Sequence, residues 1–267
     1  MSQKPLISVL MGIYNCADTL EEAVNCIIDQ TYENWELIMC DDCSSDNTYE
    51  TAKRIAAKDK RIILLKNDKN MTLAPTLNNC LKRAGGEYVA RMDGDDICDK
   101  ERFKKELDIL EKYPEYAVVS CKMELFDNAG TFGYAEYREK PKIEDFVSAS
   151  QVCHAGCMIR KSVLDELNGY NTSSDVERIE DYDLWIRLYA KGYKAYNIQE
   201  YLYSMRDDRN AIKRKKFKFR LKEYKLKRNM CKTFNLPLKS RMRCFRPIIL
   251  GIMPSFVYVL LHKKAHK

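Results

Sequence analysis

The feature that most constrains this chain is the regular alternation, over its first half, of short apolar runs with longer amphipathic segments. Each run has the length of a buried strand, and the segments between the runs carry apolar residues at helical spacing. The runs lie at Leu6–Gly12, Trp35–Cys40, Arg61–Leu65 and Tyr88–Met92, with a further helix expected near Lys100–Tyr113 and a further strand at Tyr116–Leu125. Strands joined by short helical connections pair in parallel. The pattern predicts an α/β fold built on a doubly wound, mostly parallel, Rossmann-like sheet.

Polar clusters follow three of these predicted strands. They are GIYN at 12–15, DDCSSD at 41–46 and DGDD at 93–96. In doubly wound sheets, ligands bind beyond the carboxyl ends of the strands. We therefore expect the three clusters to meet in one cleft.

Four aspartates crowd the last cluster and the residues after it. Asp93, Asp95, Asp96 and Asp99 fall within seven residues. Carboxylates this close repel one another unless they are solvated or hold a cation. Hard oxygen ligands suit Mg²⁺ or Mn²⁺. A solvated turn that caps the next helix is the alternative interpretation.

The sequence lacks the glycine-rich loops that bind phosphates through backbone amides. No GxGxxG follows the first strand and no GxxxxGK[ST] occurs, which disfavours dinucleotide-binding proteins and phosphate-loop NTPases. A Gly-rich loop containing Arg, as expected in a sugar nucleotidyltransferase, is also missing after the first strand. A diphosphate is therefore expected to bind this chain through a divalent cation.

Three segments resemble a family 2 glycosyltransferase with the GT-A fold. They are the run from ISVLMGIYN to DDCSSDNT, then GEYVARMDGDD and IEDYDLWIRL, and together they span roughly residues 5–205. The resemblance implies an inverting hexosyl- or N-acetylhexosaminyltransferase. It would use a nucleotide sugar, most simply a UDP-sugar, and a hydroxyl of a glycan or lipid-linked acceptor in cell-surface polysaccharide synthesis.

The resemblance also implies where the donor binds. Gly12, Tyr14 and Asn15 stand where the family contacts the base and ribose, and Asp42 stands where the base N–H is accepted. Asp42 as a simple cap of the next helix is an equal alternative.

For the metal and the catalytic base, the resemblance implies acidic residues from two segments. Asp95 is the expected direct metal ligand and Asp93 the ligand nearer the ribose or the metal waters. Asp181, with Glu180 beside it, stands where the general base is found. It is also a first-turn acid that the helix dipole favours.

His154 and Trp185 fall where the family builds its acceptor or donor sugar pocket. A structural histidine and a core tryptophan are the alternatives. Eleven cysteines at irregular spacing are interpreted as reduced, small apolar residues, with a zinc site at Cys153, His154 and Cys157 as the alternative.

Charge divides the chain in two. Residues 1–205 carry 26 Lys/Arg and 36 Asp/Glu, a net charge of −10, whereas 206–267 carry 20 and 3, a net charge of +17. We predict a catalytic domain at 1–205, with a nucleotide-binding half at about 1–125 and an acceptor half at about 126–205, in which residues 126–151 are expected to be loop-rich. A basic, largely helical extension follows at 206–267.

The extension mixes cations with aromatic and apolar residues, and its apolar runs are too short and interrupted to span a bilayer. This composition suits an element lying on an anionic membrane surface; packing onto the body is the alternative. Nucleic acid fits the acidic body poorly, so we expect none as a partner. Because the first residues lack a signal-peptide pattern, we expect a cytoplasmic protein, peripheral at the inner face of the cell membrane.

Two other functions stay open from the sequence. One is a non-catalytic nucleotide-sugar-binding or membrane-scaffold protein, and the other is a sugar nucleotidyltransferase.

Overall fold

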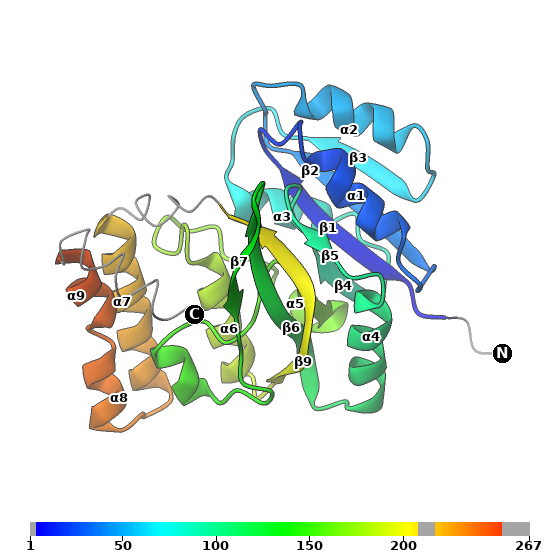
Figure 1. Ribbon diagram of the computed structural model, residues 1–267. Helices are drawn as coiled ribbons and strands as arrows, with labels where there is room; N and C mark the ends of the chain where they lie inside the picture. Colours follow the sequence, from blue (N-terminus) through cyan, green and yellow to red (C-terminus); the bar gives the residue numbers. More distant parts are fainter. Residues whose placement is uncertain (1–3, 208–216, 253–267) are drawn as a thin grey trace.

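The predicted sheet forms, and it continues into the second half of the chain (Figure 1). The computed structural model describes residues 4–207 and 217–252. Its strands form one mixed sheet in the order β3-β2-β1-β4-β8-β6-β9-β5, with β7 paired to β6. The strands are β1 (Ile7–Ile13), β2 (Trp35–Asp41), β3 (Ile62–Lys66), β4 (Tyr88–Arg91), β5 (Ile97–Cys98), β6 (Tyr116–Asp127), β7 (Gly130–Ala135), β8 (Met158–Arg160) and β9 (Lys194–Arg206).

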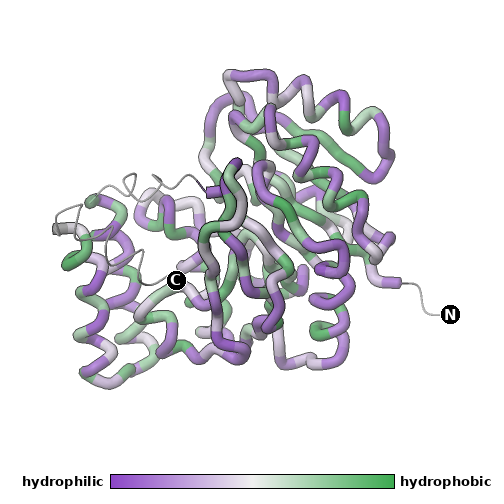
Figure 2. Tube along the Cα trace, viewed as in Figure 1, coloured by the Kyte–Doolittle hydropathy of each residue, from purple (hydrophilic) through white to green (hydrophobic). Residues whose placement is uncertain are grey.

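Helices cover both faces of the sheet. They are α1 (Leu20–Ile28), α2 (Thr48–Ala56), α3 (Leu73–Leu81), α4 (Arg102–Lys112), α5 (Lys161–Glu166), α6 (Glu180–Ala190), α7 (Phe217–Thr233), α8 (Leu238–Arg243) and α9 (Arg246–Ile252), with a 3₁₀ helix η1 (Ile143–Val147). One hydrophobic core joins the sheet to α1, α2 and α4, and a second joins it to α3, α5, α6, η1 and α7. Figure 2 shows the strands at the centre as the more hydrophobic part of the trace.

The first half of the chain confirms the predicted alternation. β1 pairs in parallel with β2 and β4, and β2 pairs in parallel with β3. β1 and β2 are buried almost throughout, as expected for strands with helices on both faces.

The second half contains more regular secondary structure than its sequence indicated. The 126–151 segment, expected to be loop-rich, contains β7 and η1, and β7 forms a hairpin with β6. β9 was not predicted; it pairs in parallel with β6 along its length. Because β8 is antiparallel to both β4 and β6, β9 points the same way as β1 and β4. Its carboxyl end, Arg206, therefore lies at the edge where the polar clusters were expected.

The basic extension packs on the body through α7. Lys222 Nζ lies 3.1 Å from a carboxylate oxygen of Glu177. Lys227 is almost fully buried, lies 2.9 Å from Glu223 and stands over the Tyr182 ring at 5.1 Å. Within the described residues, no helix is both long and apolar enough to cross a membrane.

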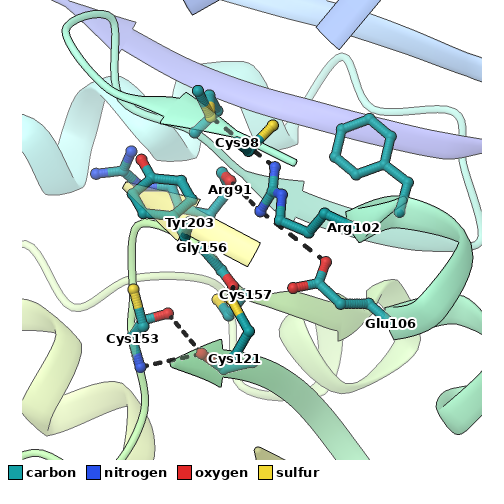
Figure 3. A network of polar contacts seen from close by, with 12 residues as sticks. Arg91, Cys98, Arg102, Glu106, Cys121, Cys153, Gly156, Cys157 and Tyr203 are labelled. Atoms are coloured by element: carbon teal, nitrogen blue, oxygen red, sulfur yellow. Dashed lines mark hydrogen bonds and ion pairs between the residues drawn. The ribbon is translucent and has the colours of Figure 1, made fainter. Parts of the chain in front are cut away.

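Two buried, ionisable side chains of α4 lie next to each other on the side of the helix that faces the sheet (Figure 3). The side chains of Arg102 and Glu106 are both fully buried, and Arg102 Nη1 is 3.9 Å from Glu106 Oε2. Arg102 also donates to the backbone oxygen of Arg91 at 3.2 Å and lies 5.4 Å from the Tyr203 ring centre. Neither oxygen of Glu106 has a hydrogen bond from the described residues. Burial raises the pKa of Glu106 to about 8, against a smaller lowering by Arg102.

This raised pKa predicts a pH-dependent stability that Glu106→Gln removes. Between the ordinary glutamate pKa and about 8, the folded protein keeps a proton that the unfolded chain releases, so its stability falls as pH rises. One proton corresponds to about 1.4 kcal/mol per pH unit. In urea unfolding from about pH 5 to about pH 8, the wild type is expected to lose stability more steeply than Glu106→Gln.

Glu50→Gln, an exposed change on α2, is the control and should parallel the wild type. Asp96 adds its own slope to all three proteins, so the difference isolates Glu106. Equal slopes in the wild type and Glu106→Gln would show that Glu106 does not titrate in this way.

Candidate functional site

A cavity of about 390 Å³ opens at the carboxyl ends of β1 and β4. All three predicted polar clusters contribute to its wall. The lining includes Gly12, Tyr14, Asn15, Asp46, Asp93 and Asp95. The prediction that these clusters meet in one cleft is confirmed, because parallel strands end at the same edge.

The turn after β1 presents Tyr14 to this cavity. Asn15 has a left-handed backbone (φ 49°), its N–H donates to Ser44 Oγ at 3.1 Å, and its Oδ1 accepts the Ser45 N–H at 2.9 Å. Tyr14 is 51% exposed. A Cβ added at Gly12 would lie 3.3 Å from side-chain carbons of α3, so a side chain there would crowd that helix.

Asp42 organises a neighbouring loop. Its Oδ1 accepts from Met71 N at 2.7 Å and Asn67 Nδ2 at 2.8 Å, and its Oδ2 accepts from Thr72 N at 2.9 Å. The Asp42 N–H donates to Ile13 O at 2.9 Å, next to the Tyr14 turn. The side chain is 5% exposed and is absent from the cavity lining, but each carboxylate oxygen keeps acceptor capacity. Its contact with a base stays a prediction.

The DGDD loop after β4 holds two carboxylates at the cavity. Asp93 Oδ1 lies 2.6 Å from Arg91 Nη1, and Arg91 is buried. Asp95 is exposed, and no described side chain donates a hydrogen bond to its carboxylate. Partial loss of hydration raises the pKa of Asp95, and the charge of Asp93 raises it further. A cation placed between the two would relieve this repulsion.

The third carboxylate of the loop, Asp96, serves as an anchor. Its Oδ2 accepts from Tyr203 Oη and its Oδ1 from Arg206 N, each at 2.7 Å. Burial, followed by the charges of Asp93 and Asp95, raises the pKa of Asp96 to about 8. β9 therefore holds the loop from the side opposite β1.

Arg206 is a site residue that the sequence analysis assigned to the extension. It lines the cavity, and its Nε donates to Asp95 O at 3.0 Å. Its Nη2 lies 2.6 Å from Glu22 Oε2, and its guanidinium carbon lies 4.5 Å from the Phe126 ring centre. A prediction of β9 would have identified it, because Arg206 ends that strand.

The donor atoms of this cavity suit a hard divalent cation. Asp93 and Asp95 supply carboxylate oxygens, and Mg²⁺ commonly takes one or two carboxylates together with substrate phosphates and water. Across residues 4–207 and 217–252, no group of three or more His, Cys, Asp or Glu gathers as a metal site. The residues therefore fit a metal that a diphosphate helps to hold, and not an all-protein cage.

The first turn of α6 carries the second acidic patch. Glu180 and Asp181 are half-buried there. Burial and then the charge of Asp181 raise the pKa of Glu180. Farther along the helix, Arg187 Nε lies 2.6 Å from Asp183 Oδ2, and its Nη1 donates to Leu167 O at 2.8 Å, which fixes α6 against the segment after α5.

His154 and Trp185 pack together beside this patch. The His154 ring meets the Trp185 ring edge to face at 5.9 Å, and its Nε2 lies 2.9 Å from Tyr170 Oη. Burial lowers the pKa of His154, and the charge of Arg91 lowers it further. Trp185 is fully buried, in contact with the His154 ring. A role for either in a sugar pocket stays a prediction.

Arg91 connects the two acidic patches. Arg91 forms the ion pair with Asp93. Its charge also opposes the rise in the pKa of Glu180 and adds to the lowering of the pKa of His154. Its Nε is buried and has no hydrogen-bond partner among the described residues. The sequence analysis gave it no role, although a basic residue inside an apolar strand immediately before DGDD was a usable signal.

Comparison with known proteins assigns the family. Residues 8–167 match the sequence profile of Glycosyl transferase family 2. The chain is 40% identical over 265 residues to "Putative glycosyltransferase EpsE" of Bacillus subtilis (strain 168), covering 99% of this chain and 95% of that protein. It is 29% identical over 245 residues to UDP-Glc:alpha-D-GlcNAc-diphosphoundecaprenol beta-1,3-glucosyltransferase WfaP of Escherichia coli, covering 90% of each.

Solved structures with the same fold include one that is named a mannosyltransferase and one that was solved with UDP-GlcNAc bound. TarS 1-349 of S. aureus superposes with a TM-score of 0.67 at 17% identity, over 90% of this chain and 72% of that one. The mannosyltransferase PcManGT of Pyrobaculum calidifontis, in complex with GDP-Man and Mn²⁺, superposes with a TM-score of 0.62 at 17% identity, over 99% of this chain and 80% of that one.

The family match decides against the nucleotidyltransferase and scaffold alternatives, because named glycosyltransferases align along nearly the whole chain. The sheet order and the structural neighbours agree with that match. The chain therefore belongs to glycosyl transferase family 2 and is a glycosyltransferase with a GT-A fold.

Proposed function

We propose that this protein transfers a hexosyl or N-acetylhexosaminyl group, with inversion, from a UDP-sugar to a hydroxyl of a lipid-linked glycan acceptor in cell-surface polysaccharide synthesis. The observation that carries the proposal is the cavity in which Tyr14 and Asn15 face Asp93 and Asp95. WfaP, by its name, uses UDP-Glc and a diphosphoundecaprenol-linked acceptor. TarS has been solved with UDP-GlcNAc.

The donor end of the cavity offers separate contacts for the two parts of a nucleotide diphosphate. Gly12, Tyr14 and Asn15 would contact the base and ribose, with Asp42 adding an acceptor. Asp95 and Asp93 would hold Mn²⁺ or Mg²⁺, which supplies charge neutralisation of the departing diphosphate. Arg206 lines the same wall and holds the Asp95 backbone in place.

The acceptor end would use Asp181 as general base. An acceptor hydroxyl is a poor nucleophile at neutral pH, so a carboxylate within hydrogen-bond reach should take its proton as the bond to the anomeric carbon forms. Direct displacement by that hydroxyl inverts the anomeric configuration. Beside it, the pKa of Glu180 is raised, first by burial and then by the charge of Asp181. His154 and Trp185 would form part of the wall of the sugar pocket.

The protein is also proposed to work in the cytoplasm, peripheral at the inner face of the cell membrane. A diphosphate-linked polyprenyl acceptor is anchored in the bilayer, so its enzyme must work at the surface. The basic extension would supply the attraction to anionic lipid, at about 1 kcal/mol for each cation near the surface.

Asp95→Asn is predicted to remove most metal-dependent turnover. The amide keeps the size of the side chain but loses the charge that would hold the cation, and metal stabilisation of a leaving group contributes several kcal/mol. We expect kcat/KM to fall by about 100-fold or more, measured as UDP release from a panel of UDP-sugars with Mn²⁺ and after EDTA treatment.

Asp99→Asn is the matched control, because Asp99 is an exposed aspartate just after β5, four residues beyond Asp95, and its carboxylate accepts the Glu101 N–H at 2.8 Å. It should keep near wild-type turnover. Full activity of the wild type in EDTA would contradict the metal assignment.

Asp181→Asn is predicted to lower kcat by about 10²–10⁴-fold, the usual contribution of a general base, while the KM for the donor changes little. Steady-state kinetics with a saturating acceptor separate the two constants. Asp175→Asn, an exposed change shortly before α6, is the control. Loss of kcat in Glu180→Gln with Asp181→Asn active would assign the base to Glu180 instead.

A further inference from the structure

Four apolar side chains of α8, α9 and the turn between the two helices form an exposed row along the chain. Leu238, Met242, Phe245 and Ile249 are 73%, 64%, 45% and 53% exposed. Leu238 and Met242 lie one turn apart on α8 and Ile249 lies on α9, while Phe245 lies in the turn between them, its ring centre 5.0 Å from that of Tyr224. α8 and α9 follow each other almost directly, and Phe245 N donates to Met242 O at 3.3 Å. We call this row and its flanking cations the α8–α9 face.

The flanking cations have no acidic partners in the described part of the chain. They are Lys239, Arg241, Arg243 and Arg246, all exposed. The cations of α7 differ, since Lys222 and Lys227 pair with carboxylates of the body and of α7 itself. Residues 217–252 of the extension contain eleven Lys/Arg and one acid, Glu223.

A groove of about 420 Å³ runs beside the row. It is lined by Ser148, Met242, Arg243, Arg246, Ile249 and Leu250. Arg246 is held in place because its Nη1 donates to Ser148 O at 2.7 Å. Two guanidinium groups next to an apolar wall match a phosphate joined to hydrocarbon.

We propose that the α8–α9 face is the surface on which this protein rests on an anionic phospholipid bilayer, with the apolar row at the level of the upper acyl chains and a lipid phosphate in the Arg243–Arg246 groove. The proposal deepens the peripheral location proposed above and rests on it. It assigns the contact to a defined face, whereas the sequence pattern pointed to the whole extension.

Charge selects the occupant of this face. A symmetric dimer would place the face of one copy against the same face of the other. Cations would then meet cations across a low-dielectric contact, which costs free energy. An anionic bilayer supplies both the opposite charge and an apolar layer.

The face and the helix that carries the proposed base both contact η1. Arg246 reaches Ser148, at the end of η1, and Tyr182 donates its hydroxyl to Phe146 O in η1. Tyr182 directly follows Asp181 in α6. A bilayer under α8 and α9 therefore lies next to the acceptor side of the enzyme.

The test is co-sedimentation of the full chain with vesicles of phosphatidylglycerol mixed with phosphatidylcholine, and of phosphatidylcholine alone. The wild type is expected to bind the anionic vesicles and to bind more weakly as salt rises. Met242→Asp/Ile249→Asp and, separately, Arg243→Glu/Arg246→Glu should each weaken binding about tenfold or more. Arg243→Glu alone keeps the Arg246 contact and should give a smaller loss in the same direction.

Matched controls place the same changes elsewhere. Ile28→Asp introduces an acid at a partly exposed apolar residue of α1, and Lys53→Glu/Lys60→Glu reverses two exposed cations of the body. These should bind as the wild type does. UDP release in solution, without vesicles, should be unchanged in every variant and shows that each is folded.

Each outcome decides the matter. A wild type that ignores anionic vesicles overturns the membrane location, while solution UDP release judges the glycosyltransfer separately. A wild type that binds, with α8–α9 variants that bind equally well, overturns the assignment to this face. If removal of residues 253–267 abolishes binding while the α8–α9 variants keep it, the contact belongs to that segment. A change from dimer to monomer in the variants, with unchanged vesicle binding, assigns the face to self-association.

Discussion

The ion pair between buried Arg91 and Asp93 is the interaction on which the candidate site depends. β4 ends in a loop whose carboxylates repel one another, and a loop of that kind would move away from the sheet without an opposing charge. Arg91 Nη1 takes one oxygen of Asp93 at 2.6 Å and leaves the other for a ligand. Arg91 is buried and Asp93 is 31% exposed, so removal of the carboxylate would leave a buried cation without its partner, which is costly.

The same loop is held from its far side by β9. Tyr203 and Arg206 both bond to Asp96, and Arg206 also bonds to the backbone of Asp95. Arg102 supports this arrangement from below, since it contacts both the Arg91 backbone and the Tyr203 ring (Figure 3). Two strands, β4 and β9, and the helix α4 thus hold the loop that carries Asp93 and Asp95, and none of these contacts uses Asp95 Oδ1 or Oδ2.

The pattern of apolar and polar residues was sufficient to predict the first four strands and the helices between them. The four parallel strands and their helices have buried apolar faces that repeat with the right period, and the polar ends of the strands had to share an edge. β9 was missed because its sequence, KAYNIQEYLYSMR, mixes exposed and buried residues and pairs with a strand 77 to 80 positions earlier in the chain. Arg206 was consequently counted with the basic extension. The roles of Asp96 and Tyr203 also depend on that pairing, which periodicity cannot report.

The division of charge between body and extension has a consequence for orientation. A body of −10 is repelled by an anionic bilayer, and an extension of +17 is attracted. Screening limits both forces to about 8 Å at physiological ionic strength, so only the surface nearest the lipid is attracted. The proposed α8–α9 face shares no residue with the lining of the acidic cavity, so lipid phosphates and a donor diphosphate would bind at separate places. The separation of the two charges along the chain would thus let one protein bind an anionic surface through its cations and, as proposed, an anionic donor through a metal held by its carboxylates.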